Sequence, residues 1–302
     1  NYGRDVRENG QYVSFDKSQI RHMKILLHFG FPKTMSSSLQ FGLFKPLHDR
    51  NMVNLKTWRQ DDCNEHMDLR PSSRLFNNQE ILNPYLDFKD NILNILSDEG
   101  FTYPIKVRRN NYGNNIEDPL LFPKKIKEQI SSKYGNNIEF IPFITIRNQV
   151  DLMYSLYVEE YNLKKYKDID ILFDDKKRID LTGFGVFNFY RYISALESVF
   201  GKGKCNIFFF EDWIHDFDSC CDRLANLMEI EPNIVRNFML DSHVNKKKKS
   251  SKGYYVKDGS VLIPFLTSSQ KQQILSFFEK DNLKLQKFFG PEIDLVELQY
   301  LN

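Results

Sequence analysis

The sequence predicts an α/β fold in which a central parallel sheet is flanked by helices. Three short runs, at 23–31, 137–147 and 205–213, are almost continuously apolar, as expected of strands that are buried on both faces. A segment whose apolar residues recur at helical spacing comes after each of these runs. Strands and helices therefore alternate along the chain, which is typical of a parallel sheet.

The first predicted strand covers 23–31, and a helix at 36–47 follows it until Pro46 ends the helical pattern. A second helix is expected over 83–101, because its apolar residues also recur every three or four positions. The inner faces of the two helices carry large apolar side chains: Leu39, Leu43 and Phe44 in the first, and Phe88, Ile92, Ile95 and Leu96 in the second.

The second half of the chain repeats the alternation. Buried strands are predicted at 137–147 and 205–213, and a basic, flexible loop at 243–255 comes before the last helix. Gly201 ends the helix that contains it, because glycine is a common residue just past a helix C-terminus. The predicted helices are 149–163, 185–201, 218–230 and 268–289.

The composition limits the class of protein. The 302 residues carry a formal net charge of +2, so no global field attracts nucleic acid and any anion site must be local. No apolar run is long enough for a membrane span, and residues 1–22 lack the apolar core of a secretory signal. We expect a cytoplasmic chain without a membrane span, with 1–22 as a disordered leader or tag and 23–302 as a single domain.

The cysteines show no metal-binding spacing. The chain has four of them, none in a C-x-x-C pair, so no zinc or other metal site is predicted. A reducing compartment is the default for such a chain. The cysteines are Cys63, Cys205, Cys220 and Cys221.

The turn after the first predicted strand reads PKTMSSS. A tight turn from a strand into a helix aims free backbone N–H groups at one point, where the positive helix terminus favours an anion. Lys33 adds a full charge, and Pro32 stiffens the turn. The G-x-x-x-x-G-K-[ST] spacing of a P-loop is absent, and the residues equally fit a serine-capped turn without a ligand. The hydroxyl donors are Thr34, Ser36, Ser37 and Ser38.

A second signal lies in TIRNQVDLMYSLY. Arg147 stands where a predicted strand ends, and Ser155 follows about two helical turns later. An arginine can bind a phosphate through two parallel hydrogen bonds, with the serine donating from the side. The alternative is that Arg147 pairs with Asp151 while Ser155 only packs.

Together, FGFPKTMSSSLQ and TIRNQVDLMYSLY resemble the two phosphate-binding motifs of sulfotransferases that use 3′-phosphoadenosine 5′-phosphosulfate (PAPS). In that family the first motif holds the 5′-phosphosulfate and the second holds the 3′-phosphate. The resemblance implies a three-layer, P-loop-like fold, PAPS as the sulfuryl donor and its desulfated form, PAP, as the product. The cofactor-binding residues that it implies here are Pro32, Lys33, Thr34, Met35, Ser36, Ser37, Ser38, Arg147 and Ser155.

Two later segments extend the resemblance. CNIFFFEDW is similar to a late strand of the family that ends in an acidic pair, and HVNKKKKSSKG occupies the place of its C-terminal loop over the cofactor. We expect Asn245, Lys252 and Gly253 near the cofactor. The run Lys246–Lys249 has no interleaved aromatic residues, so we do not interpret it as a nucleic-acid site.

The chain departs from the family at Met35, where the family's turn has glycine. Glycine tolerates left-handed dihedral angles, whereas methionine does not take them easily. If Met35 keeps right-handed dihedral angles, its side chain points away and the phosphate cradle survives. If it does not, we expect the affinity for the cofactor to fall.

Sulfuryl transfer needs a base for the acceptor and stabilisation of charge at the leaving phosphate. Lys33 fits the second role, as the resemblance implies. Glu99, in ILSDEGF, is similar to a glutamate of carbohydrate sulfotransferases and is the candidate base; the alternative is a solvated carboxylate at a helix end. Other sulfotransferases use histidine, but His28 is better explained as a core residue. The remaining histidine candidates are His48 and His66.

The predicted function is transfer of a sulfuryl group from PAPS to a hydroxyl or amine of a carbohydrate or similar acceptor. Arg108, Arg109 and Tyr103 are the candidate acceptor-binding residues, although they also fit a solvated surface. The alternatives are a PAPS- or PAP-binding protein without catalytic activity and a P-loop-type kinase. The predicted partner is a small-molecule or glycan acceptor.

Overall fold

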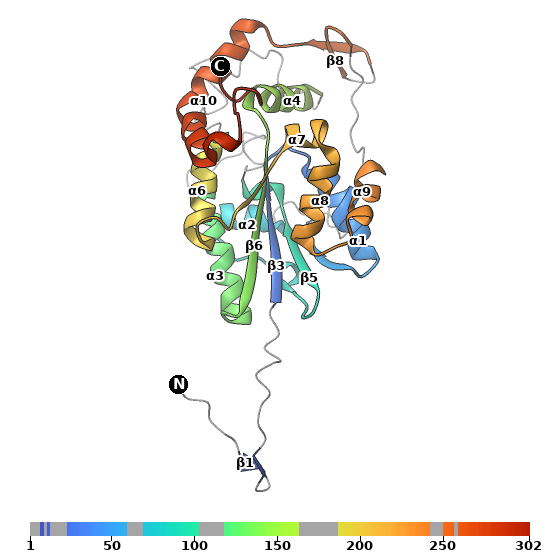
Figure 1. The fold of residues 1–302 in the computed structure, drawn as a ribbon, viewed down its shortest axis with the longest axis vertical. Helices are drawn as coiled ribbons and strands as arrows, with labels where there is room; N and C mark the ends of the chain where they lie inside the picture. Colours follow the sequence, from blue (N-terminus) through green and yellow to red (C-terminus); the bar gives the residue numbers. More distant parts are fainter. Residues whose placement is uncertain are drawn as a thin grey trace.

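A computed structural model of the chain describes residues 7–8, 11–12, 23–58, 69–102, 118–162, 187–241, 250–256 and 259–302. Its centre is a five-stranded sheet in which all neighbouring strands are parallel (Figure 1). This sheet, flanked by helices on both sides, confirms the predicted fold class. In spatial order the strands are β4 (Val53–Lys56), β5 (Leu93–Ser97), β3 (Met23–Gly30), β6 (Ile138–Ile146) and β7 (Asn206–Phe209).

The central strand, β3, is covered on both faces. Ile25 and Leu27 belong to one apolar core, whereas Leu26 between them belongs to the core on the other face. This alternation follows from the two-residue period of a strand. All three side chains are almost completely buried, which explains the continuous apolar run in the sequence.

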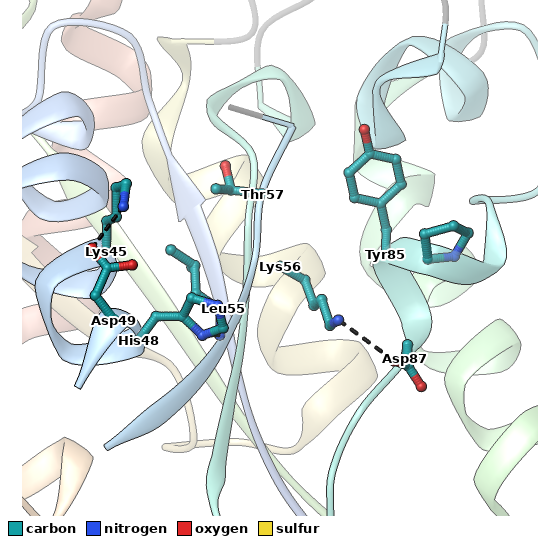
Figure 2. Close-up of a pocket in the computed structure, with 9 residues that line it drawn as sticks. Lys45, His48, Asp49, Leu55, Lys56, Thr57, Tyr85 and Asp87 are labelled. Carbon is teal, nitrogen blue, oxygen red and sulfur yellow. Dashed lines mark hydrogen bonds and ion pairs between the residues drawn. The ribbon is translucent and has the colours of Figure 1, made fainter. Parts of the chain in front are cut away.

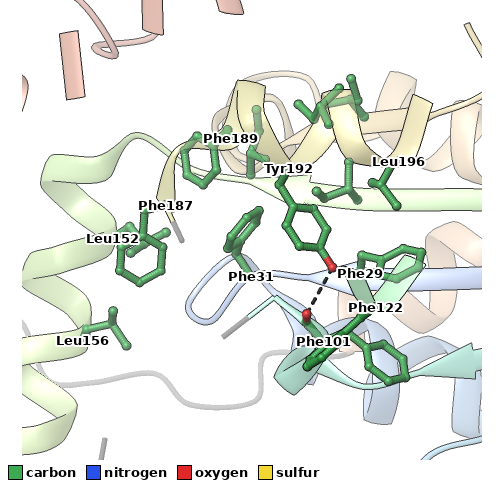
Figure 3. Close-up of a cluster of buried hydrophobic side chains, with 14 of the residues drawn as sticks. Phe29, Phe31, Phe101, Phe122, Leu152, Leu156, Phe187, Phe189, Tyr192 and Leu196 are labelled. Atoms are coloured by element: carbon green, nitrogen blue, oxygen red, sulfur yellow. Dashed lines mark hydrogen bonds between the residues drawn. The ribbon is translucent and has the colours of Figure 1, made fainter. Parts of the chain in front are cut away.

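Helices cover both faces of the sheet (Figure 1), and the apolar core between helices and sheet is larger on one face than on the other. The larger core contains aromatic side chains in mutual contact, and Tyr192 donates a hydrogen bond from its hydroxyl to the carbonyl of Phe101, 3.1 Å away (Figure 3). The helices on this face are α2 (Pro71–Phe76), α3 (Phe122–Tyr134), α4 (Gln149–Asn162), α6 (Phe189–Phe200) and α10 (Ser268–Phe289).

The smaller core lies under the helices that follow β3 and β7. Directly after the turn, the chain forms a π-helical segment, η2, which continues into α1. Its apolar side chains pack with those of α8 and α9 against the sheet. The elements on this face are η2 (Ser38–Phe44), α1 (Lys45–Asp49), α7 (Phe210–His215), α8 (Phe217–Met228) and α9 (Pro232–Asp241).

The predicted helix over 83–101 is wrong. The segment contains a 3₁₀ turn, η5 (Asn83–Leu86), then strand β5, then a second 3₁₀ turn, η6 (Glu99–Phe101). Ile95 and Leu96 pack into opposite cores, so their spacing reflects the two-residue period of a strand. Asn91, just before β5, has φ 60°, a left-handed conformation that interrupts a helix.

The strand predicted at 205–213 is shorter than expected, because the chain turns into α7 at Phe210. The acidic pair therefore lies in the first turn of a helix. Part of the loop predicted at 243–255 belongs to an antiparallel hairpin of β8 (Gly253–Val256) and β9 (Val261–Pro264). Residues 242–249 lie outside the described residues.

The other predicted elements occur close to their expected positions: the strands at 23–31 and 137–147, and the helices that became α4, α6, α8 and α10. Helix α10 begins at a capping box formed by Thr267 and Gln270, as its sequence indicates. A separate two-stranded sheet of β1 (Arg7–Glu8) and β2 (Gln11–Tyr12) lies within the predicted leader.

Candidate functional site

The candidate site lies at the carboxyl edge of the sheet, after β3 and β6. From β3 the chain runs to η2 on one face, and from β6 it runs to α4 on the opposite face. Two neighbouring strands whose connections part in this way form a topological switch point. In open α/β sheets this is the position where ligands bind.

The turn after β3 is held by its own side chains. Thr34 Oγ1 donates to the carbonyl of Phe31 at 2.7 Å and lies 2.7 Å from Thr145 Oγ1 on β6. Ser36 Oγ donates to the same Phe31 carbonyl at 2.9 Å. Because Thr34 and Ser36 are almost fully buried, these hydroxyls stabilise the turn. Ser37 and Ser38 lie partly exposed at the start of the following helix.

Gly30 ends β3 at a close backbone approach. A Cβ atom at this position would lie 2.8 Å from both His28 Nε2 and Ser36 Oγ, so only glycine fits without displacing its neighbours. The next residues in the turn are Pro32, which is buried, and Lys33, whose φ is 63°. The turn therefore folds tightly back over the end of its own strand.

Met35 adopts φ 78°, the left-handed conformation that favours glycine. Its side chain is partly buried and packs against the smaller core. Of the two alternatives that the sequence leaves open at this position, the structure shows the left-handed one. The turn has the backbone shape that glycine would give it, at a conformational cost carried by Met35.

The structure brings Lys33 and Arg147 together. Arg147 Nη1 donates to the carbonyl of Lys33 at 3.2 Å, and the guanidinium lies over the ring of Phe210, 4.2 Å from its centroid. Arg147 also approaches Asp151 at 3.8 Å, as one of the alternatives anticipates. Its Nε is buried and has no hydrogen-bond partner among the described residues.

Helix α4 places Ser155 on the face that contains Asp151 and Glu159, because residues four apart share one side of a helix. Glu159 Oε2 lies 3.1 Å from Lys33 Nζ, so this face of α4 is turned toward the loop after β3. Ser155 itself is partly exposed. Glu159 is absent from the residues that the sequence pattern identified.

The β8–β9 hairpin packs against α4. Tyr154, next to Ser155, donates from its hydroxyl to the carbonyl of Ile263 at 2.9 Å. Lys252 is fixed at the base of the hairpin, where its carbonyl accepts a hydrogen bond from the N–H of Phe265 at 3.0 Å. A Cβ atom at Gly253 would meet the Ile263 carbonyl oxygen at 1.8 Å, so this position requires glycine. Asn245 lies outside the described residues.

Asp98 and Glu99 follow β5 at the same edge of the sheet. Asp98 is completely buried and accepts hydrogen bonds from Arg70 Nε at 2.7 Å and from the N–H of Ser72 at 3.0 Å. Glu99 is partly exposed at the start of η6. Thr102 joins η6 to the end of β3 by donating to the Gly30 carbonyl at 3.0 Å.

His28 is a core residue, as expected. Its Nδ1 lies 2.7 Å from Ser97 Oγ, and its ring stacks on Phe143. Burial lowers the pKa of this imidazole to about 3, an effect that the charge of Asp98 partly opposes. His28 is therefore neutral near pH 7. His66 lies outside the described residues.

Glu211 is a buried carboxylate that contacts the residue next to Arg147. The sequence-based prediction gives it no role beyond its place in the acidic pair. Its Oε1 accepts from both the backbone N–H and the side-chain amide of Asn148, each at 2.9 Å. Its Oε2 accepts from the hydroxyl of Tyr300 at 3.2 Å. Burial raises the pKa of this carboxyl group, although the bonds from Asn148 oppose the shift. Glu211 thus fixes the residue next to Arg147.

A separate cavity of about 380 Å³ lies beside the edge strand β4 (Figure 2). His48 contributes to its wall, with Nδ1 3.2 Å from the N–H of Leu55. Its cations are paired: Lys45 with Asp49, and Lys56 with Asp87. This cavity contains none of the predicted cofactor-binding residues. The lining residues are Lys45, His48, Asp49, Leu55, Lys56, Thr57, Pro84, Tyr85 and Asp87.

The predicted acceptor-binding residues Tyr103, Arg108 and Arg109 lie outside the described residues. Within the part of the chain that is described, no cluster of histidine, cysteine or acidic side chains is arranged to hold a metal ion. None of the described helices has both the length and the apolar composition that crossing a membrane requires.

The fold is similar to a solved sulfotransferase structure. Over 91% of this chain and 98% of the other, it matches a sulfotransferase from Alicyclobacillus acidocaldarius with a TM-score of 0.54 and 13% sequence identity. A mouse sulfotransferase, SULT7A1 complexed with PAP, matches over 89% of this chain and 84% of its own, but its TM-score of 0.34 and 11% identity carry no argument. No protein-family model and no curated protein matches the chain. At this identity, the first likeness establishes the fold alone.

Proposed function

We propose that this protein is a PAPS-dependent sulfotransferase that acts on a hydroxyl or amine of a carbohydrate or similar acceptor. The observation that carries the proposal is the contact between Lys33 and Arg147, 114 positions apart in the sequence, at the switch point of the sheet. The fold likeness to a bacterial sulfotransferase supports it. The sequence motifs around both residues support it independently.

The residues at the site fit a doubly phosphorylated nucleotide. Arg147 Nε is a buried donor without a partner among the described residues, and its chemistry suits a phosphate oxygen. We assign Arg147 and Ser155 to the 3′-phosphate, and the turn from Pro32 to Ser38 to the 5′-phosphosulfate. We assign contacts with the nucleotide to Lys252 and Gly253, at the start of the β8–β9 hairpin, and to Asn245.

The proposed chemistry divides between two strand ends. PAPS supplies the sulfuryl group when bound. Lys33 neutralises negative charge that develops on the leaving phosphate, and Glu99, which follows the neighbouring strand β5, accepts the proton of the acceptor. We propose that the acceptor binds near Glu99 and contacts Tyr103, Arg108 and Arg109. We also propose that residues 23–302 form a single domain.

The direct test is incubation with labelled PAPS and a mixed panel of glycans and small molecules, read by the mass gain of a sulfuryl group. The wild-type protein should transfer the label, and Lys33→Ala should abolish transfer. Glu99→Gln should lose turnover while its affinity for PAP stays close to the wild-type value. Glu128→Gln, an exposed exchange on α3, is the matched control and should remain active.

Three outcomes would change the proposal. Full transfer by Glu99→Gln would move the role of base to another residue. If PAP binds but no acceptor of the panel is sulfated, the alternative of a binding protein without catalytic activity is favoured, and the strained Met35 is the observation behind it. If ATP competes for the nucleotide site as strongly as PAP does, the kinase alternative is favoured instead.

A further inference from the structure

Helix α4 presents two carboxylates to the candidate nucleotide site. Asp151 lies four residues before Ser155 and Glu159 lies four residues after it, so all three occupy one helix face. Asp151 Oδ2 is 3.8 Å from Arg147 Nη2, and Glu159 Oε2 is 3.1 Å from Lys33 Nζ. Lys33 and Arg147, the two cations that we assign to the phosphates, are therefore already paired with carboxylates on α4.

The two ion pairs differ in strength. The Lys33 and Glu159 side chains are 19% and 33% exposed, and Glu159 Oε2 is itself shielded from solvent. The side chain of Asp151 is 53% exposed, and its pair with Arg147 is longer. Coulomb attraction increases as distance and solvent screening decrease, so Glu159 holds its cation more strongly than Asp151 does.

The lysine contact also matters more for the proposed chemistry. The carbonyl of Lys33 accepts from Arg147, while its ammonium extends to α4 and meets Glu159. A phosphate oxygen that binds this ammonium draws on the same three N–H donors as the carboxylate, so the two anions compete for its charge and the ion pair is weakened or displaced. Displaced, the carboxylate would remain near the bound phosphates as a like charge.

We propose that Glu159 is a counter-ion that competes with the nucleotide for Lys33 and so weakens the binding of both the donor and its desulfated product. This inference rests on the proposed function. Glu159 thereby sets the affinity of the site and favours release of the product. A carboxylate with only a structural role would, when replaced, loosen α4 and weaken nucleotide binding instead.

The test is the dissociation constant of PAP, measured by calorimetry for the wild type, Glu159→Gln, Lys33→Ala and the double variant. Glu159→Gln should bind PAP at least about fivefold more tightly, because a coupled charge is removed while the side-chain shape is kept. In the Lys33→Ala background the same substitution should give a much smaller gain, since the effect acts through the ammonium. Glu128→Gln, which removes an exposed carboxylate of α3, should leave the constant unchanged.

Each result has one meaning. Wild-type protein that does not bind PAP would refute the proposed function itself. If the wild type binds, equal or weaker binding by Glu159→Gln would overturn only the role of Glu159, and an equal gain in both backgrounds would overturn its action through Lys33. The melting temperature of every variant separates a change in affinity from a loss of folded protein. Glu159→Ser is a second substitution at this position and is measured in the same way.

Discussion

Met35, like Lys33 in the same turn, has a left-handed backbone conformation that residues with a Cβ atom rarely adopt. Its φ is 78°, and it stands at the position where the turn of the family that this motif resembles has glycine. Its side chain packs against the smaller core. A left-handed conformation costs a residue with a Cβ atom about 1–2 kcal/mol. The folded structure maintains this turn because Thr34 and Ser36 bind it to the Phe31 carbonyl.

Two substitutions of Met35 should therefore differ in their effect on the affinity for PAP. Met35→Gly removes the backbone strain and should keep the affinity for PAP within about twofold of the wild type. Met35→Val adds a branched Cβ that tolerates positive φ poorly, so the affinity should fall about tenfold. Calorimetric titration with PAP measures both. Equal affinities in the two variants would show that the turn conformation does not control binding.

His28 provides a prediction about pH. Burial lowers its pKa to about 3, whereas an unfolded chain has a histidine pKa near 6.5. Between these values the unfolded state binds a proton that the folded state excludes, so stability must decrease as the pH falls through this window. At pH 4.5 the loss from this residue should be about 3 kcal/mol relative to pH 7.

Urea unfolding of wild type and His28→Gln at pH 7 and pH 4.5 measures this effect. The amide keeps a polar partner for Ser97 but does not titrate, so the variant should lose less stability on acidification. The comparison uses the difference between the two proteins, in which the other titrating groups cancel. An identical loss in both proteins would show that His28 does not contribute to the acid sensitivity.

At the residue scale, the sequence supplied the motif residues but not their partners. The turn and Arg147 were predicted because short motifs keep recognisable spacing. Glu159 was not, because only the three-dimensional packing of α4 against the turn brings its carboxylate to Lys33. Glu211 appeared in the sequence as half of an acidic pair, and its bonds to Asn148 became visible only in the fold.

At the scale of elements, one amide pair joins α4 to α10 behind the candidate site. Gln149 Nε2 donates to Asn282 Oδ1 at 2.9 Å, and Asn282 Nδ2 donates back to Gln149 Oε1 at 3.1 Å. The Asn282 amide also donates to the carbonyl of Tyr300 at 2.7 Å, so it holds the C-terminal segment. Both amide side chains are completely buried.

Asn282→Ala should destabilise the protein by about 2–4 kcal/mol, because it leaves several buried polar groups without partners. Thermal unfolding should show a melting temperature lower by about 5–10 °C. Asn226→Ala, an exposed exchange on α8, is the matched control and should shift it little. A melting temperature unchanged by Asn282→Ala would mean that water satisfies these groups and that the pair does not join the two helices.

Periodicity predicted the long elements and failed on the short ones. Helix α10 has a capping box and several turns of regular spacing, so its limits follow from the sequence. Strand β5 was taken for part of a helix because it is short and both of its faces are apolar. Strand β4, with only four residues, gives too little pattern to recognise.

At the scale of the whole molecule, the order of the strands creates the site. The sequence predicted alternating strands and helices, but it contains no signal for the order β4-β5-β3-β6-β7. That order makes β3 and β6 neighbours, and their connections leave on opposite faces. The ends of three adjacent strands consequently place Lys33, Arg147 and Glu99 along one edge of the sheet.

The measurement that tests this account most directly is the ratio of the affinities for PAP and for adenosine 5′-phosphate, which lacks the 3′-phosphate. We predict that the wild type binds PAP at least about tenfold more tightly, that Arg147→Ala loses this preference, and that the exposed exchange Arg191→Ala retains it. Equal affinity of the wild type for the two nucleotides would contradict the claim that residues after β3 and β6 bind the 5′- and 3′-phosphates of one molecule.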